Sequence, residues 1–249
     1  MGEDGGRLAP SAEFSARHPH LADPRPVGTV RVDCHLHTMW SGDCTTTPAE
    51  LAEALGQAAL DVVCITDHST ITGALRLLED GALPCRIVIG QEQRSPDGEV
   101  IGLFLSERIP AGLRSAREAV LAIRGQGGLV YVPHPFDPMR HRLKADVLRS
   151  LCDEGLVDVI EAINAKTSLH HLNEQAGAFT VRAGVAKGAG SDAHVPEAAG
   201  AAYVEMPDFA DGDPASFMES LRLGRTVGHH FDAHRPWRAR IVPSTGDRP

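Results

Sequence analysis

Five short apolar runs in this chain each lead directly into residues that bind metal ions. Each run has the length and composition of a buried β-strand. The runs are VRVDC before His35 and His37, DVVCIT before Asp67 and His68, CRIVIGQ before Glu92, LVYVP before His134, and residues 185–191 before Asp192 and His194. Because the carboxyl ends of parallel strands converge on one face of an α/β fold, these side chains are expected to meet there.

Helix-like segments separate these runs, which predicts an α/β fold. The clearest helix start is Thr47, Pro48 and Glu50, which supply an N-cap, a first-turn proline and the acid of a capping box. The turn signal at residues 95–98 predicts that residues 99–105 return as a hairpin strand. Further helices are expected near residues 74–78, 115–126, 144–152, 169–183 and 215–223, and a late strand at residues 202–206.

This spacing predicts one barrel-like, TIM-barrel-like domain over residues 29–249, ending in a tail from Arg225 that carries His229, His230 and His234. Residues 1–28 are rich in Gly, Ala and Pro and are expected to form a flexible N-terminal arm. The default expectation for the tail histidines is exposure to solvent.

Charge and cysteine content narrow the class of partner. The formal net charge is -9 and no dense Lys/Arg run occurs, which argues against binding to long nucleic acid but permits a small anionic ligand. The five cysteines form no CxxC motif, which disfavours a disulfide framework and a zinc knuckle and fits a reducing compartment. No segment approaches the roughly 20 apolar residues of a membrane span, so we predict a cytoplasmic protein without a membrane partner.

The residue types at the strand ends favour particular metals. Two histidines spaced as in His35-Leu36-His37 lie on one side of an extended chain and can reach one ion. Imidazole with carboxylate suits Zn, Mn or Fe, and Glu92 could bridge two ions. Each motif alone is weak evidence: Asp67 could be a helix cap, and His18-Pro19-His20 has the same spacing but follows no predicted strand, so we assign it no function.

Taken together, the motifs closely resemble the PHP family, named after polymerase and histidinol phosphatase domains. The matching segments are DCHLHT at residues 33–38, ITDH at 65–68, Glu92 after a strand, VPHP at 132–135 and GSDAH at 190–194, in the family's order. The resemblance implies a distorted (β/α)7 barrel with two or three divalent metal ions at the C-terminal ends of the strands.

The resemblance also implies a set of ligands. His35, His37, Glu92 and Asp192 would hold one ion, and Glu92 would bridge to a second ion that takes His134. Asp43, His68 and His194 would hold a third ion, while Asp67 would bind directly or orient a neighbour. One departure is that the strand at residues 99–105 lacks the further histidine of many trinuclear members, which leaves the second ion short of a ligand. Glu161 and Asn164 match another family position, either around the ligands or as a solvated strand end.

The function that this resemblance implies is hydrolysis of a small phosphomonoester or nucleotide by a metal-bound hydroxide. His194 or His68 would donate a proton to the leaving oxygen, unless either is simply a ligand. Arg140 is the first choice for binding phosphate, ahead of Arg94, Arg142 and Lys166. The alternatives are a 3′ to 5′ nuclease acting on short oligonucleotides and a non-catalytic metal-binding module. The sequence predicts neither the substrate nor the oligomeric state.

Overall fold

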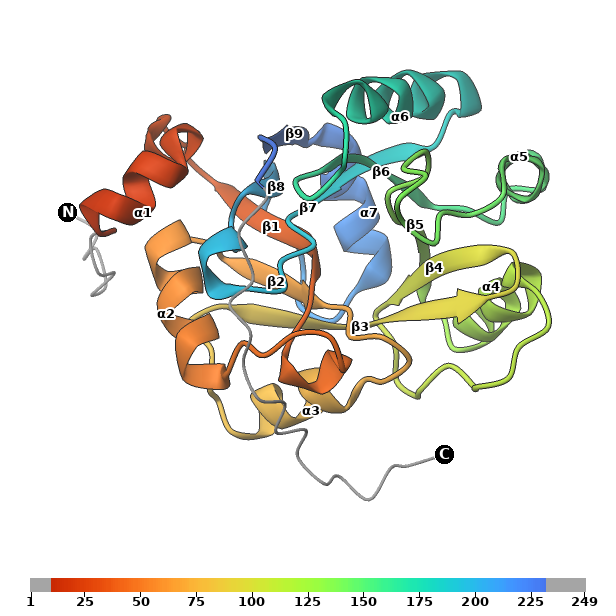
Figure 1. The fold of residues 1–249 in the computed structure, drawn as a ribbon, viewed down its shortest axis with the longest axis horizontal. Coiled ribbons are helices and arrows are strands. Elements are labelled where there is room, and N and C mark those ends of the chain that lie inside the picture. Colours follow the sequence, from red (N-terminus) through yellow and green to blue (C-terminus); the bar gives the residue numbers. More distant parts are fainter. Residues whose placement is uncertain (1–9, 232–249) are drawn as a thin grey trace.

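The computed structural model of the chain describes residues 10–231, and a single nine-stranded sheet runs through this part (Figure 1). The order across the sheet is β7-β6-β5-β4-β3-β2-β1-β8-β9. The strands are β1 (Thr29–Leu36), β2 (Val62–Ile65), β3 (Arg86–Ser95), β4 (Gly98–Leu103), β5 (Leu129–Val132), β6 (Val159–Asn164), β7 (Ala186–Gly190), β8 (Ala202–Pro207) and β9 (Arg225–Gly228).

The sheet combines parallel and antiparallel pairs and nearly closes on itself. Strands β1, β2 and β3 are parallel neighbours, as are β5, β6 and β7, whereas β4 is antiparallel to both β3 and β5. Past the end of β7, Asp192 N donates to His35 O at 2.8 Å and His37 N donates to Ala193 O at 3.1 Å. These bonds join the end of β7 to β1, which lies inside the sheet order, and so nearly close the barrel at this point. The expected distorted barrel is confirmed.

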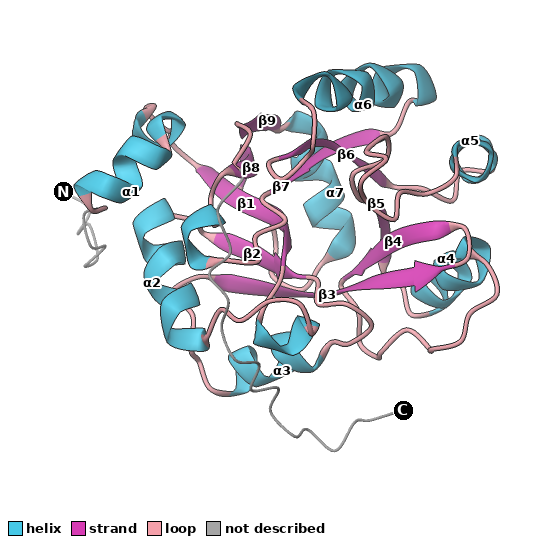
Figure 2. Ribbon diagram, viewed as in Figure 1, coloured by secondary structure: helices cyan, strands magenta, loops and turns pink. Residues whose placement is uncertain are grey.

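Helices cover the outside of the sheet, and one helix fills its inside (Figure 2). The helices are α1 (Ala12–Arg17), α2 (Pro48–Ala58), α3 (Thr72–Glu79), α4 (Ala116–Gly125), α5 (Ala145–Asp153), α6 (His170–Ala183) and α7 (Pro214–Leu223). Helices α2 and α3 share one apolar cluster with the outer face of β1 and β2. Residues of α7, including Phe217 and Leu221, pack against Val32 and Tyr131 inside the barrel. The core therefore lies on both sides of the sheet.

The expected capping box at the start of α2 is confirmed. Glu50 N donates to Thr47 Oγ1, and the Glu50 carboxylate accepts from Thr47 N at 3.0 Å. These bonds satisfy amide groups that have no partner within the first turn of a helix. The hairpin strand β4 also follows the predicted turn, since Ser95 pairs with Gly98.

At both ends, the described part of the chain forms secondary structure that we did not predict. Within the expected flexible arm, α1 is followed by a short 3-10 helix, Pro19–Ala22, and Phe14 and His18 are buried against the domain. The tail begins with strand β9, which pairs with β8. Phe14 belongs to the same apolar cluster as residues of α2, and Val227 of β9 packs against this cluster. The local sequence patterns did not predict these contacts. His234 lies outside the described residues.

Among residues 10–231, none of the helices has the length and apolar character needed to span a bilayer.

Candidate metal centre

An irregularity in β1 turns His35 and His37 into the barrel. Val32, Asp33 and Leu36 pair with Val62, Val63 and Ile65, so β1 contains one extra residue between Asp33 and Leu36. Strict alternation would have placed Leu36 inside with Val32, but Leu36 joins the outer apolar cluster instead. Such a bulge re-aims side chains at the end of a strand. Here it lets both histidines face the barrel interior.

The two histidines face two buried carboxylates. Nε2 of His35 and Nε2 of His37 lie 3.1 Å apart. Glu92 Oε2 is 3.6 Å from the first and 3.3 Å from the second, and Asp192 Oδ1 is 3.8 Å and 3.5 Å away. His35, His37 and Asp192 thus form one candidate group for holding an ion.

Glu92 also reaches two other histidines. Its Oε1 is 3.1 Å from His134 Nε2, and its Oε2 is 3.1 Å from His68 Nδ1. His35, Glu92 and His134 form a second candidate group. Glu92 therefore occupies the central position that a bridging ligand requires.

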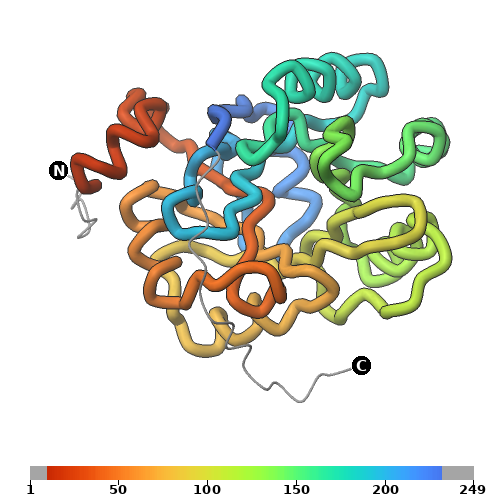
Figure 3. The backbone as a smooth tube through the Cα atoms, viewed as in Figure 1, coloured from red at the N-terminus to blue at the C-terminus, as the bar shows by residue number. Residues whose placement is uncertain are grey.

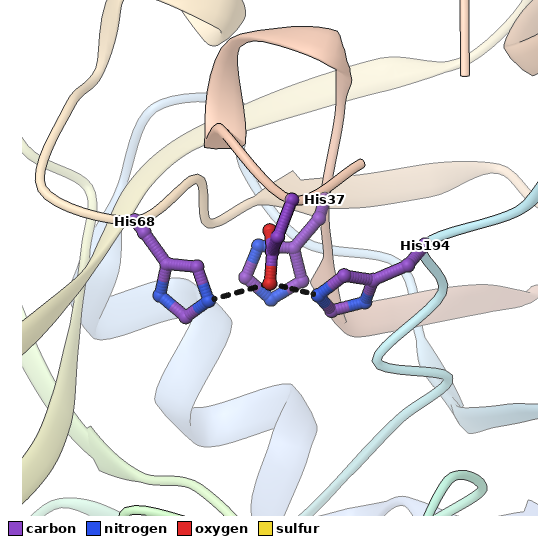
Figure 4. A group of neighbouring side chains, drawn as sticks. His37, His68 and His194 are labelled. Carbon is purple, nitrogen blue, oxygen red and sulfur yellow. Dashed lines mark hydrogen bonds and ion pairs between the residues drawn. The ribbon is translucent and has the colours of Figure 1, made fainter. Parts of the chain in front are cut away.

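Three histidines surround Asp43 at the mouth of the site (Figure 4). Asp43 Oδ2 lies 3.1 Å from His194 Nε2 and 3.4 Å from His68 Nε2, and the ring of His37 stands behind them. All four side chains form a third candidate group. The structure thus brings together Asp43, His68 and His194, whose side chains come from different loops.

Glu99 is the residue that the sequence analysis missed. This carboxylate on β4 is buried and lies 3.9 Å from His68 Nδ1 and 3.7 Å from His134 Nε2. With His68 and Glu92 it forms a fourth candidate group. The strand that lacked the expected histidine therefore supplies a carboxylate. Glu99 pairs with Arg94 in the β3–β4 hairpin, two residues beyond Glu92 on the same strand face, and the predicted hairpin was the available signal.

Asp67 does not join any candidate group among the described residues. Its Oδ1 accepts from Thr38 N at 2.7 Å and its Oδ2 accepts from Thr38 Oγ1 at 2.6 Å. Both oxygens are therefore occupied in holding the loop that follows β1. Of the two roles expected for Asp67, direct binding of an ion and orientation of a neighbour, these contacts with Thr38 fit the second.

Glu161 and Asn164 lie beneath the candidate ligands rather than in solvent. Glu161 Oε1 accepts from His35 Nδ1 at 3.0 Å, and its Oε2 accepts from His134 N at 2.7 Å. Asn164 donates to Glu161 at 2.9 Å and to Asp192 at 3.3 Å. By taking the Nδ1–H of His35, Glu161 leaves Nε2 to face the site, an arrangement common around metal ions.

Backbone strain and close packing coincide with the site. His134 and Asp192 have positive φ angles of 29° and 50°, a region that costs energy for residues other than glycine. A Cβ on Gly190 would lie 2.3 Å from His35 Cβ and 2.9 Å from Glu161 Oε1. Glycine at this position allows β7 to approach the histidine closely.

A small cavity of about 120 Å³ is lined by Arg94, Arg140 and Lys166 together with seven candidate ligands: Asp43, His68, Glu92, Glu99, His134, Asp192 and His194. Arg94 Nε donates to Glu99 at 2.7 Å, and Lys166 Nζ lies 3.4 Å from Asp192 Oδ1. Arg140 Nη2 donates to Lys166 O at 2.8 Å. Arg142 instead donates to Phe136 O and is absent from the lining within the described chain.

The surrounding charges favour the ionised form of two buried carboxylates, Glu92 and Asp192. Burial alone would raise the pKa of Glu92, but His35 and His134 hold it well below its ordinary value. Burial would likewise raise the pKa of Asp192, but Lys166 and His35 hold it well below. Buried carboxylates with imidazole nitrogens beside them are stabilised when a divalent cation binds between them.

The donor set fits divalent metal ions. Imidazole nitrogen and carboxylate oxygen are the ligands that Zn, Mn and Fe accept. Nδ1 of His68 is buried and forms no hydrogen bond within residues 10–231, although Glu92 Oε2 is 3.1 Å away. His68 Nδ1 and Glu92 Oε2 are therefore better explained as two ligands of one ion than as the donor and acceptor of a hydrogen bond. An α/β barrel with such a cluster at its strand ends is a metal-binding barrel protein.

Comparison with known sequences gives the family. The PHP domain matches residues 33–109, and the PHP-associated region matches residues 170–226. An uncharacterized protein of Methanocaldococcus jannaschii, MJ0417, is 34% identical over 203 residues, which cover 78% of this chain and 80% of the relative. A second protein of that organism, MJ1587, is 36% identical over 121 residues, which cover 44% of this chain and 70% of the relative. The chain belongs to the PHP domain family.

Solved structures share the fold at low sequence identity. A two-domain protein containing a predicted PHP-like metal-dependent phosphoesterase from Bacteroides vulgatus has a TM-score of 0.65 at 19% identity, covering 83% of this chain and 67% of that one. PsfC from Pseudomonas syringae has a TM-score of 0.62 at 20% identity, covering 81% and 92%. A lesion-specific endonuclease from Pyrococcus furiosus has a TM-score of 0.58 at 15% identity, covering 78% and 56%.

Proposed function

We propose that this protein is a metal-dependent hydrolase of a small phosphoester, either a phosphomonoester or a nucleotide. The observation that carries the proposal is the set of overlapping His, Asp and Glu groups beside three cationic side chains in one small cavity. Membership of the PHP domain family supports the same reaction class. Bound divalent ions would lower the pKa of a water molecule and neutralise charge on the phosphoryl oxygens.

The protein's own side chains would hold and orient the reactants. Arg140 and Lys166 reach the cavity from the loops after β5 and β6, and both can donate to phosphoryl oxygens. Arg94 is already paired with Glu99, so its first role is to hold that carboxylate. Arg140 therefore remains our first choice for binding phosphate.

His194 and His68 fit the role of ligands better than that of proton donors. His194 Nδ1 lies 2.8 Å from Asp192 O and 2.8 Å from Lys166 Nζ, while Nε2 faces Asp43. His68 Nδ1 lies 3.1 Å from Glu92 Oε2, and its Nε2 lies 3.4 Å from Asp43 Oδ2. Since both nitrogens of each ring face other groups of the site, little freedom remains for proton transfer. Lys166, next to His194 and Asp192, is the better-placed donor to a leaving oxygen.

The nuclease alternative has one argument against it at the site. Binding of single-stranded nucleic acid without sequence preference relies on stacking of bases on aromatic rings. Among the described residues, the lining of the cavity contains no Phe, Trp or Tyr. We therefore rank a mononucleotide or another small phosphoester above an oligonucleotide.

Metal analysis followed by a substrate panel tests the proposal. The metal-loaded protein is assayed with sugar phosphates, histidinol phosphate, mononucleotides, 3′,5′-bisphosphonucleotides and short oligonucleotides. We expect turnover of at least one small phosphoester, and turnover of oligonucleotides alone would favour the nuclease. If the metal-loaded protein hydrolyses none of them, the proposal is wrong.

Substitution of the candidate ligands tests whether this site performs the reaction. We expect His35→Ala and Asp192→Ala to abolish turnover while circular dichroism stays unchanged. His171→Ala, which alters an exposed histidine on α6, is the matched control and should retain wild-type turnover. Wild-type rates in the first two variants would exclude the site.

A further inference from the structure

Three histidines meet outside the barrel site, at the junction of the two ends of the described chain. His18 is the N-cap of the short 3-10 helix after α1, His20 lies within that helix, and His229 follows β9. Figure 3 traces the backbone of these two segments, in red and in blue. His229 Nδ1 lies 3.0 Å from His20 Nδ1, although the two residues are 209 positions apart. One ring nitrogen from each of the three histidines lies within 4.8 Å of the others.

Hydrogen bonds to the backbone determine which nitrogen of two rings faces the centre of this histidine cluster. His18 Nε2 is 2.8 Å from Glu197 O, and His20 Nε2 is 2.9 Å from Gly200 O. A carbonyl oxygen only accepts, so both Nε2 atoms carry the hydrogen. In a neutral imidazole Nδ1 then presents a lone pair, and a backbone carbonyl on the other nitrogen is the usual support of a metal-binding histidine.

The environment keeps the three rings in the neutral form that binds metal. Burial lowers the pKa of His18 and of His20 below the ordinary 6.5. Burial, with His20 and His18 nearby, lowers the pKa of His229 to about 4. Arg31 also lowers the pKa of His20, and its own charge is opposed by Glu205, 3.9 Å away.

Hydrogen bonding among the histidines does not account for the whole cluster. A bond between His229 Nδ1 and His20 Nδ1 would leave His18 Nδ1 without a partner, and that atom is buried with no hydrogen bond among residues 10–231. His18 itself is 1% exposed, so water has little access to it. Buried polar atoms normally have a partner, and a lone pair aimed at two other imidazoles suits a cation.

We propose that His18, His20 and His229 bind a divalent transition metal ion, for which Zn²⁺ is the best chemical fit. Zn–N bonds of about 2.0–2.1 Å place tetrahedral ligands roughly 3.3 Å apart, so small movements of the rings would complete the site. The ion cross-links the N-terminal helical segment to the end of β9, two segments that are far apart in the sequence. This site is separate from the barrel cluster and does not depend on the proposed reaction.

Counting metal ions in matched variants tests the site. The full-length protein is stripped with a chelator, reloaded with Zn²⁺, desalted and analysed for zinc per chain. We expect His20→Ala and His229→Ala each to hold one zinc equivalent fewer than the wild type, and His171→Ala to hold the wild-type amount. Both substituted positions are only half-buried, so circular dichroism should show a retained fold.

A measurement on the unchanged protein covers the case in which the variants do not fold. Anomalous diffraction at the zinc edge from Zn²⁺-loaded crystals should show a peak between the three rings. Equal zinc content in folded wild type and variants, or no anomalous peak at this position, would establish a hydrogen-bonded histidine cluster and overturn the proposal. Either result leaves the test of the barrel site unaffected.

Discussion

Glu161 is a buried carboxylate that orients the candidate ligands without facing the metal positions itself. It accepts from His35 Nδ1, from His134 N and from Tyr131 Oη at 3.0 Å. These bonds hold an imidazole and a strained backbone at the same time. Glu161 is therefore a positioning residue. From the sequence it could have been either a group around the ligands or a solvated strand end.

Replacing Glu161 should weaken the site without removing a ligand. We expect Glu161→Gln to lower metal affinity or turnover by about 10-fold to 100-fold, since the amide no longer holds His35 by a charged acceptor. Titration of the stripped protein with Mn²⁺ or Zn²⁺ measures this. Glu174→Gln, on the exposed face of α6, is the control. If the metal affinity of Glu161→Gln is unchanged, Glu161 does not position the ligands.

A second prediction concerns a single residue, Glu99, as a metal ligand. It faces His68 and His134 from β4, the strand that in many trinuclear members of the resembling family supplies a histidine. We expect Glu99→Gln to reduce the metal content or turnover of the reloaded protein, because a carboxylate ligand is lost. Glu99→His should restore part of it, because imidazole can bind the same ion. Full metal content and activity in Glu99→Gln would argue against a ligand role.

The elements around the barrel mouth are tied to one another by polar contacts between loops. Asp137, in the loop after β5, accepts from Ser168 N and Ser168 Oγ at 2.7 Å each and from Thr167 Oγ1 at 3.2 Å. The first loop carries Arg140 and the second follows Lys166. Asp137 therefore keeps the two cations that we assign to substrate binding near each other.

Removing this charge should destabilise the fold in a pH-dependent way. Burial would raise the pKa of Asp137, but hydrogen bonds from Ser168 and from the backbone of Met139 hold it below its usual 3.8. We expect Asp137→Asn to cost about 1–3 kcal/mol in the free energy of unfolding. Since the folded pKa is depressed, the stabilisation is present above about pH 4 and is lost as the pH falls through the folded pKa.

Urea denaturation at pH 7 and at successively lower pH measures both effects. Wild type and Asp137→Asn should differ at pH 7 and converge in acid. Asp211→Asn, in an exposed turn before α7, is a matched control that should follow the wild type. A difference that grows as the pH falls would contradict the assignment.

In the whole molecule, several carboxylates lie close together at the mouth of the barrel, and their negative charge favours bound cations. Asp43, Glu92, Glu99 and Asp192 all line one cavity, with Arg94, Arg140 and Lys166 as the partly compensating charges. The same loops close the barrel between β7 and β1. Metal binding and the stability of the closed barrel should therefore be coupled.

Chelation should lower the melting temperature. An ion present at 100 times its dissociation constant stabilises the folded state by about 2.7 kcal/mol, and each kcal/mol corresponds to roughly 2–4 °C for a chain of this size. We expect a loss of several degrees after chelation and its recovery on reloading. The scan is repeated in His20→Ala, so that the histidine cluster does not contribute. An unchanged melting temperature in both proteins would show that no stabilising ion binds at the barrel.

The sequence by itself determined the class of fold and most of the candidate ligands. Apolar runs of strand length and the polar residues that follow them are local patterns, and parallel strands bring their carboxyl ends together whatever the details of packing. His35, His37, Glu92, His134 and Asp192 could therefore be named from their place after a predicted strand, although β1 extends to Leu36 and β3 to Ser95 in the structure. The capping box at Thr47 was readable for the same reason.

Only the tertiary structure decided how the side chains point and which distant residues meet. The extra residue in β1 reverses the expected alternation, and a similar register shift in β6 lies between Glu161 and Ile163. Strand periodicity contains no information about such bulges. Glu99 enters the site through antiparallel pairing with β3, and His18 and His20 meet His229 across almost the whole chain. These contacts depend on the path of the backbone in three dimensions, which no local pattern specifies.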